Sequence, residues 1–171
     1  MASPTAGALT VAQAMADLAA KRLTQPVVVE DSQANLQANL ANLQKLTAAG
    51  KLSALSLTDG DASLQFTAAQ INTSSALLTK VMSSGVTVKV ADTAINTARM
   101  ASRISTAFEV TVTDSAENIQ KSLTGLQTLA VTGKLDTLTF TDASPALTLK
   151  ASQFGATAAL RAKMPDAAIT I

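Results

Sequence analysis

The segment Asp59-Gly60-Asp61 comes nearest to a metal-binding loop in this sequence. Two carboxylates on a turn are a start toward the roughly six to eight oxygen ligands that Ca²⁺ takes. A later segment of similar pattern reads Asp142-Ala143-Ser144 and has one carboxylate fewer. The glycine-rich nonapeptide of calcium-binding β-rolls is absent. We therefore expect Asp59 and Asp61 to form a turn, with calcium as the alternative, and we expect no other cofactor.

A row of aspartates follows the predicted strands, at the edge where α/β enzymes place catalytic groups. The five are Asp31, Asp59, Asp92, Asp114 and Asp142. Aspartate in this position also caps the following helix or opens a turn, which is the interpretation we favour. The sequence has no His, Cys or Tyr, so most of the usual general bases and nucleophiles are missing. We expect no enzyme, and a small carbohydrate-active enzyme using paired carboxylates is the third alternative.

These aspartates belong to a duplication that runs through most of the chain. Residues 27–88 align with residues 110–171 at a constant offset of 83 positions, and 23 of the 62 aligned pairs are identical. Such a fixed period indicates an array built from repeated units. Positions shared by the two copies are those that the fold needs twice, so they describe a scaffold better than a unique active site.

Alternating apolar and polar residues predict five strands with one buried face each. They lie at residues 86–90, 108–112, 138–140, 147–149 and 169–171. Apolar residues at helical spacing predict a helix after Asp31-Ser32 and another after Asp114-Ser115, closed by Gly50 and Gly133. Further helices are expected near residues 10–22, 68–82, 93–105 and 151–164. Turn-rich segments at 58–63 and 141–146 predict tight hairpins.

The predicted fold is an α/β (α+β) two-layer tandem repeat with helices on one sheet face. Each unit has the order β-α-β-β-α-β, and a continuous α/β solenoid is the alternative. The chain divides into an N-terminal helix segment (1–26), repeat unit 1 (27–92), a connecting helix (93–109) and repeat unit 2 (110–171). Asn35 and Asn118, which recur in both units, are expected to make buried structural hydrogen bonds.

Charge and composition exclude several kinds of partner. The net charge is +1 and aromatic residues make up 2% of the chain, so no basic surface with stacking aromatics for nucleic acid is expected. No apolar run is long enough for a membrane-spanning helix. The first ten residues lack the basic and apolar regions of a Sec-type signal peptide.

The shared frame resembles a known class of repeat. It reads V-x-D-S-x-x-N-[LI], then G-K-L, L-x-[LF]-T-D and A-x-Q, carried by Asp31, Ser32, Asn35, Gly50, Gln70 and their partners at the same offset. This frame is similar to repeats of large bacterial extracellular proteins exported by type I secretion, near hemolysin-type and surface-layer proteins. The resemblance covers residues 27–171. It implies a secreted or cell-surface structural role and no catalytic residues.

The leading functional hypothesis is therefore a non-enzymatic extracellular protein that self-assembles into a filament, surface layer or matrix. An adhesin-type repeat module that binds a cell-surface glycan or a protein is the second hypothesis. Strand 169–171 matches strand 86–88, after which the first unit continues into a helix like that near residue 10. We expect head-to-tail contacts between copies, made by Val27, Val28, Val29, Ile169, Thr170 and Ile171.

Overall fold

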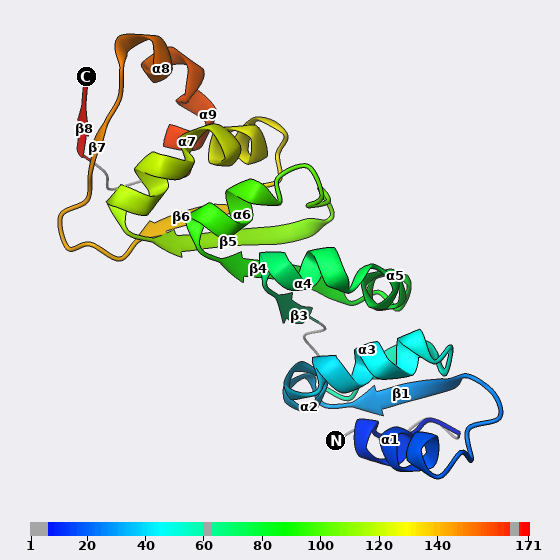
Figure 1. The fold of residues 1–171 in the computed structure, drawn as a ribbon. Helices are drawn as coiled ribbons and strands as arrows, with labels where there is room; N and C mark the ends of the chain where they lie inside the picture. The colour runs from blue at the N-terminus through cyan, green and yellow to red at the C-terminus, as the bar shows by residue number, and fades with distance from the viewer. Residues whose placement is uncertain (1–6, 60–62, 165–167) are drawn as a thin grey trace. The chain divides into compact units, whose positions relative to one another are not determined.

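The computed structural model describes residues 7–59, 63–164 and 168–171. It is a mixed α/β structure, shown in Figure 1. The helices are α1 (Val11–Ala19), α2 (Gln33–Ala38), α3 (Leu40–Ala48), α4 (Ala68–Thr73), α5 (Ser75–Ser83), α6 (Ala94–Arg99), α7 (Ala116–Val131), α8 (Ala151–Ala156) and α9 (Ala158–Arg161). The strands are β1 (Val27–Asp31), β2 (Leu52–Leu57), β3 (Ser63–Phe66), β4 (Thr87–Asp92), β5 (Phe108–Asp114), β6 (Thr137–Phe140), β7 (Ala146–Thr148) and β8 (Ala168–Thr170).

The order of the elements agrees with the prediction, but the two predicted hairpins are wrong. The strands are ordered β1-β2, β3-β4-β5-β6 and β7-β8 in three sheets, so β2 is not hydrogen-bonded to β3, nor β6 to β7. The pairs β1–β2, β5–β6 and β7–β8 are parallel. Each of these pairs is joined through helix, and a crossover of this kind brings the second strand back in the same direction. The short segments at 58–63 and 141–146 instead lead from one sheet to the next.

Several predicted helices are interrupted or shorter than expected. The helix predicted at 68–82 breaks at Ser74, and the helix predicted at 151–164 breaks at Thr157, the equivalent position of the second copy. At both breaks the backbone leaves the α conformation, with φ/ψ of −115°/25° at Ser74 and −99°/14° at Thr157. The predicted caps Gly50 and Gly133 are confirmed, with φ of +66° and +68°, a conformation that glycine adopts without steric cost.

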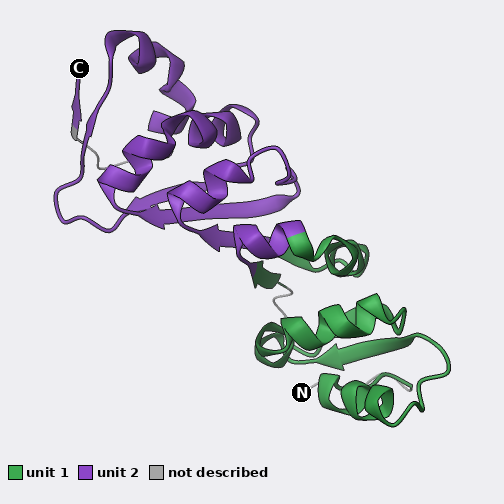
Figure 2. Ribbon diagram, in the orientation of Figure 1, with its two compact units in different colours: residues 1–65, 73–88 green, residues 66–72, 89–171 purple. Residues whose placement is uncertain are grey.

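Two compact units make up the chain (Figure 2). Unit 1 comprises residues 1–65 and 73–88, and unit 2 comprises residues 66–72 and 89–171. The division therefore falls within β4, whereas the segments expected from the sequence meet after residue 92.

Equivalent apolar side chains form the cores of both units. In unit 1, the side chains of Val29, Leu36, Leu43 and Leu46 are fully buried. Their counterparts at the repeat offset in unit 2 are also fully buried: Val112, Ile119, Leu126 and Leu129. The apolar stripe predicted from the sequence is therefore the buried face of α2, α3 and α7.

Helices α6 and α7 approach each other most closely at Gly125. A Cβ atom on Gly125 would lie 2.6 Å from the Cβ of Ala98 and 2.9 Å from its Cα and carbonyl oxygen. These atoms belong to the backbone or to the shortest side chain, so they cannot rotate away. The absence of a side chain at Gly125 thus sets the distance between the two helices.

We expect Gly125→Ala to destabilise the protein by about 1–3 kcal/mol, because the added methyl overpacks this helix contact. Gly155→Ala is the matched control, since Gly155 lies in α8 and a Cβ atom placed on it would meet no atom within 4 Å. That control should stabilise by roughly 0.5–1 kcal/mol, because alanine restricts the unfolded chain and favours helix. Urea unfolding followed by circular dichroism measures both. Equal changes in unfolding free energy for the two substitutions would show that α6 and α7 can move apart without cost.

Candidate functional site

Aspartates at strand ends form one recurring hydrogen-bonded arrangement. The motif D-[ST]-x-x-N occurs at residues 31–35, 92–96 and 114–118. In each copy, Oδ1 of the aspartate accepts hydrogen bonds from the next backbone N–H and from the asparagine Nδ2, at distances of 2.7–3.0 Å. The Ser or Thr of the motif is the N-cap of the following helix. Asn35 and Asn118 thus make structural hydrogen bonds, but the expected burial is wrong: Asn35 is exposed and Asn118 half-buried, and their partner is the aspartate at the start of the motif.

The second carboxylate oxygen of each motif caps a different helix. Oδ2 accepts the N–H of the first residue of a helix that lies earlier in the chain, at 2.9–3.2 Å. The pairs are Asp31 with Val11 of α1, Asp92 with Ala68 of α4, and Asp114 with Ala94 of α6. Asp59 and Asp142 do the same for Gln33 of α2 and Ala116 of α7, at 2.7 and 2.6 Å. Each carboxylate therefore satisfies N–H groups that a helix start leaves unpaired.

Asp114 is the most strongly held of these groups. It is 8% exposed, and burial alone would raise its pKa. The hydrogen bonds from Asn118 and from the backbone of Ala94 and Ser115 outweigh burial and lower the pKa below its ordinary value of 3.8. The carboxylate is therefore ionised at neutral pH, and its negative charge lies at the starts of α6 and α7.

These hydrogen bonds bear on the metal site considered from the sequence. The carboxylate of Asp59 is already an acceptor for a helix N–H, while Asp61 lies outside the described residues. Within the ranges described, no three acidic, histidine or cysteine side chains gather as a metal site would require. All five aspartates cap a helix, but that helix starts earlier in the chain, whereas the sequence led us to expect a cap on the following helix or a turn.

Glutamine side chains make a second set of links between segments of each unit. In unit 1, the Gln37 amide bonds the backbone N–H and carbonyl of Gln65, at 2.7 and 2.9 Å. Its equivalent Gln120 accepts the N–H of Thr148 in unit 2 at 2.9 Å. In each unit, a glutamine side chain therefore hydrogen-bonds to the backbone of a later strand. This contact holds the helix that carries the glutamine against that strand.

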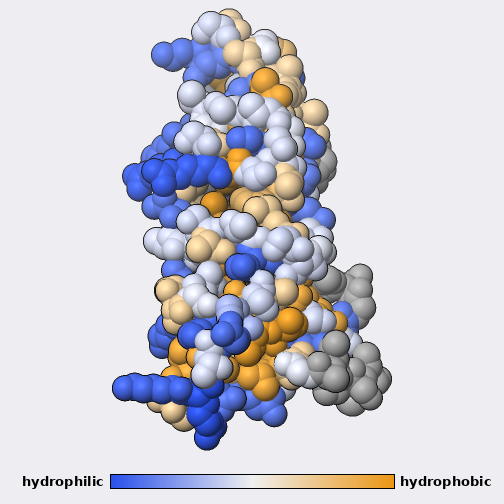
Figure 3. All heavy atoms as spheres, turned by 90° about the vertical axis from the view of Figure 1, so that its right-hand side faces the viewer, coloured by the Kyte–Doolittle hydropathy of each residue, from blue (hydrophilic) through white to orange (hydrophobic). Residues whose placement is uncertain are grey.

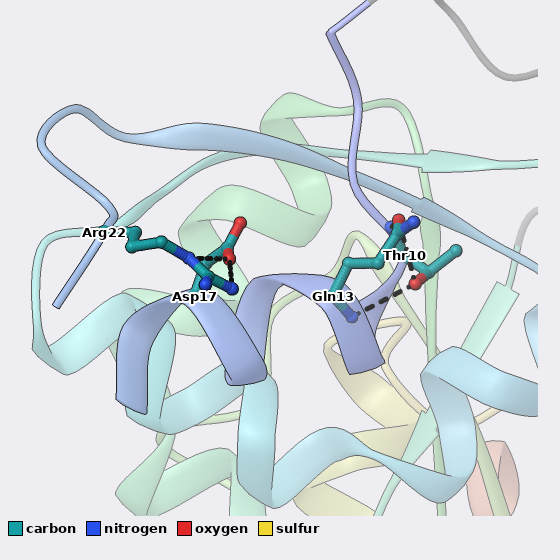
Figure 4. Close-up of polar contacts among 4 residues, drawn as sticks. All are labelled: Thr10, Gln13, Asp17 and Arg22. Atoms are coloured by element: carbon teal, nitrogen blue, oxygen red, sulfur yellow. Dashed lines mark hydrogen bonds and ion pairs between the residues drawn. The ribbon is translucent and has the colours of Figure 1, made fainter. Parts of the chain in front are cut away.

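Helix α1 begins with a capping box that is drawn in Figure 4. The N–H of Gln13 donates to Oγ1 of Thr10 at 3.2 Å, and the N–H of Thr10 donates to Oε1 of Gln13 at 2.9 Å. Arg22 donates from Nε to Oδ1 of Asp17 at 2.8 Å after the last turn of the helix. Both ends of α1 are therefore fixed by local polar contacts.

The residues predicted to mediate assembly lie on β1 and at β8. Val29 is fully buried, and Val27 and Val28 are half-buried on β1. One edge of β1 pairs with β2. On the other edge, Leu9 accepts from Glu30 and donates to the carbonyl of Val28, while the N–H of Val27 donates to the carbonyl of Lys51 on the β2 side.

Strand β8 has a partner on one side. It pairs with β7, and Leu149 donates to the carbonyl of Thr170 at 2.9 Å. Since neighbouring residues of a strand direct their N–H and C=O groups to opposite sides, those of Ile169 and Ile171 face away from β7. The side chain of Ile171 is 68% exposed.

Two features of the arrangement could have been found from the sequence. The third D-[ST]-x-x-N copy, Asp92 to Asn96, matches the other two by inspection. Thr10 and Thr93 are both N-caps and are related by the same repeat offset, which extends the repeat before residue 27. The links from each aspartate to a helix that starts far earlier in the chain carry no local sequence signal.

None of the helices in the described part of the chain has the length and apolarity that crossing a membrane demands. In comparisons with known proteins, no family model, no curated protein and no solved structure matches the chain.

Proposed function

We propose that this chain is a non-enzymatic, extracellular structural protein that assembles head to tail with copies of itself into a filament, surface layer or matrix. The two repeat units are modules of one repeating array in this proposal, and contacts between copies repeat the contacts between modules. The proposal rests on the pairing of β8 compared with the pairing of its equivalent strand.

Strand β8 corresponds to the start of β4, because Thr170 aligns with Thr87 at the repeat offset. In its sheet, β4 has the neighbours β3 and β5, whereas β8 has β7 alone within the described residues. The equivalent of β5 in the first copy is β1. In this proposal, β1 of a second copy lies beside β8 in the place that β5 has beside β4.

The arrangement of residues 7–31 supports this placement. Leu9, Thr10, Val11 and Asp31 reproduce the positions of Asp92, Thr93, Ala94 and Asp114, and in both sets the later aspartate caps the helix. Leu9 takes the place of the last residue of β4 beside β1. Strand β8 of another copy would continue that line toward the Val27 end of β1.

The surface also suits association. Figure 3 shows hydrophobic side chains among hydrophilic ones on the face turned to the viewer, and exposed apolar surface contributes to protein–protein contact. A contact between β8 of one copy and β1 of the next uses two different surfaces. Such a heterologous contact produces open fibres unless its rotation closes a ring.

The test uses Ile169, whose N–H faces away from β7. Ile169→Pro removes that N–H and leaves the Leu149–Thr170 bond in place, while Ile169→Ala trims the same side chain and keeps the N–H. In sedimentation velocity at rising protein concentration, we expect the unchanged chain and Ile169→Ala to form growing oligomers. Ile169→Pro should remain monomeric with an unchanged circular dichroism spectrum.

Two results would contradict the proposal. One is oligomers of Ile169→Pro that form as readily as those of the unchanged chain. The other is an unchanged chain that sediments as a monomer at every concentration.

A further inference from the structure

A groove lies between α6 and α7 in unit 2. Its volume is about 400 Å³, within the range of small-molecule sites. Its walls come from both helices, which are in close contact where Gly125 meets Ala98. The lining residues are Ile95, Ala98, Arg99, Lys121, Ser122, Thr124 and Gly125.

Comparison of the two copies of the repeat separates residues required by the fold from residues that are not. At the corresponding positions of the first copy, every lining residue is different: Ala12, Met15, Ala16, Ala38, Asn39, Ala41 and Asn42. The core and capping residues of the same helices are instead shared, as in Asp31 and Asp114 or Leu43 and Leu126. Arg99 and Lys121 thus place two cations where the first copy has two alanines, although both copies build helices at these positions.

The charge in the groove is only partly compensated. Lys121 Nζ lies 2.6 Å from Oε1 of Glu117, in an ion pair that is exposed to solvent. Arg99 is exposed and forms no ion pair with any residue that the structure describes. One free guanidinium and one ammonium, on opposite walls, are donors suited to a carboxylate or phosphate.

The remaining lining residues suit a small polyhydroxylated ligand. Ser122 and Thr124 provide hydroxyl groups, which donate and accept hydrogen bonds. Ile95 and Ala98 provide an apolar surface on the α6 wall. Cationic groups, hydroxyl groups and an apolar wall therefore line the same open groove.

We propose that this groove binds an acidic sugar, with the carboxylate or phosphate held by Arg99 and Lys121. The sugar hydroxyls bond to Ser122 and Thr124, and the apolar face of the ring packs on Ile95 and Ala98. This site is independent of the proposed self-assembly, because β8 and β1 contribute none of its residues. An exposed ion pair is weak, so the ligand displaces Glu117 from Lys121.

The test is an NMR titration of the ¹⁵N-labelled full chain at constant ionic strength. The probes are glucuronate, glucose 6-phosphate, glucose and inorganic phosphate. We expect the first two to shift the amide signals of residues 95–99 and 121–125, and glucose to leave them unchanged. The stronger of the two acidic sugars identifies whether carboxylate or phosphate is preferred.

Two variants return the groove to the residues of the first copy. Arg99→Ala and Lys121→Ala should each weaken binding of the preferred sugar about tenfold, as expected when one charged hydrogen-bond donor is lost. Lys89→Ala is the matched control, since Lys89 is an exposed cation outside the groove and is paired with Glu109. It should leave the affinity unchanged, and the melting temperature of each variant verifies folding.

Three outcomes would overturn the proposal. Absence of shifts with both acidic sugars would show that the groove is not a sugar-acid site. Equal weakening by Lys89→Ala would show that only overall charge matters. An affinity for inorganic phosphate or glucose equal to that for the acidic sugars would show that the combined recognition of anion and sugar is wrong.

Discussion

Replacing Asp114 by Asn should lower the free energy of unfolding by about 2–3 kcal/mol at neutral pH, the range for losing hydrogen bonds to a buried charged group. Asp114 accepts three N–H donors, from Ser115, Asn118 and Ala94. An asparagine at this position keeps one acceptor oxygen and turns an NH₂ group toward the remaining donor. With the amide oxygen toward Ser115 and Asn118, the N–H of Ala94 at the start of α6 faces the NH₂ group and loses its acceptor.

The same carboxylate makes stability depend on pH. Its pKa is lower in the folded chain than its ordinary value of 3.8, because the three hydrogen bonds outweigh burial. A lowered pKa means that the stabilisation is fully present above about pH 4 and is lost as the pH falls through the folded value. Thermal unfolding between about pH 2 and pH 7 should therefore show a steeper acid loss for the unchanged chain than for Asp114→Asn.

The repeat supplies a matched control for this prediction. Asp31 makes the equivalent three bonds with Ser32, Asn35 and Val11, but it is less buried than Asp114. Asp31→Asn should cost less, since water can replace part of the lost bonding. A larger loss for Asp31→Asn than for Asp114→Asn would contradict the importance that we assign to burial.

The order of elements and the caps could be predicted because their signals are local. Asp114-Ser115 before an apolar stripe and Gly133 after it mark both ends of α7, which runs from Ala116 to Val131. Because the two copies align at a constant offset of 83 positions, each assignment in one copy also applies to the corresponding residue of the other. These signals depend on neighbours within a few residues, and one sequence contains them fully.

The strand partners could not be predicted in the same way. The short polar segment after Leu57 has the composition of a hairpin turn, yet Asp59 in that segment accepts the N–H of Gln33. Its role depends on a residue 26 positions away, and a turn residue and a long-range cap look alike in the sequence. The groove between α6 and α7 has no sequence signal for a related reason, because Arg99 and Lys121 line it together only through the packing of the two helices.

Leu123→Ala and Leu40→Ala should each cost about 2–5 kcal/mol of unfolding free energy, the range for truncating a buried leucine. The two residues are equivalent in the repeat and are 5% and 8% exposed, so the predicted equivalence of their burial is confirmed. Val131→Ala is the control, because Val131 is 65% exposed and its truncation should change stability by at most about 0.5 kcal/mol. Urea unfolding followed by circular dichroism provides the measurement.

The two leucines should differ in cost because their helices differ. Leu123 lies within α7, an uninterrupted helix of 16 residues, which cannot collapse readily around a missing side chain. Leu40 is the first residue of α3 and follows the break at Asn39. The Asn39 amide donates to the carbonyl of Asn35 and accepts from the side chain of Asn42, but the helix is interrupted there, so the backbone can move to fill part of the cavity. The cost of a cavity depends on how far the site relaxes, and we expect Leu123→Ala to be the more damaging substitution. A larger loss for Leu40→Ala would show that the break at Asn39 is held as firmly as a continuous helix.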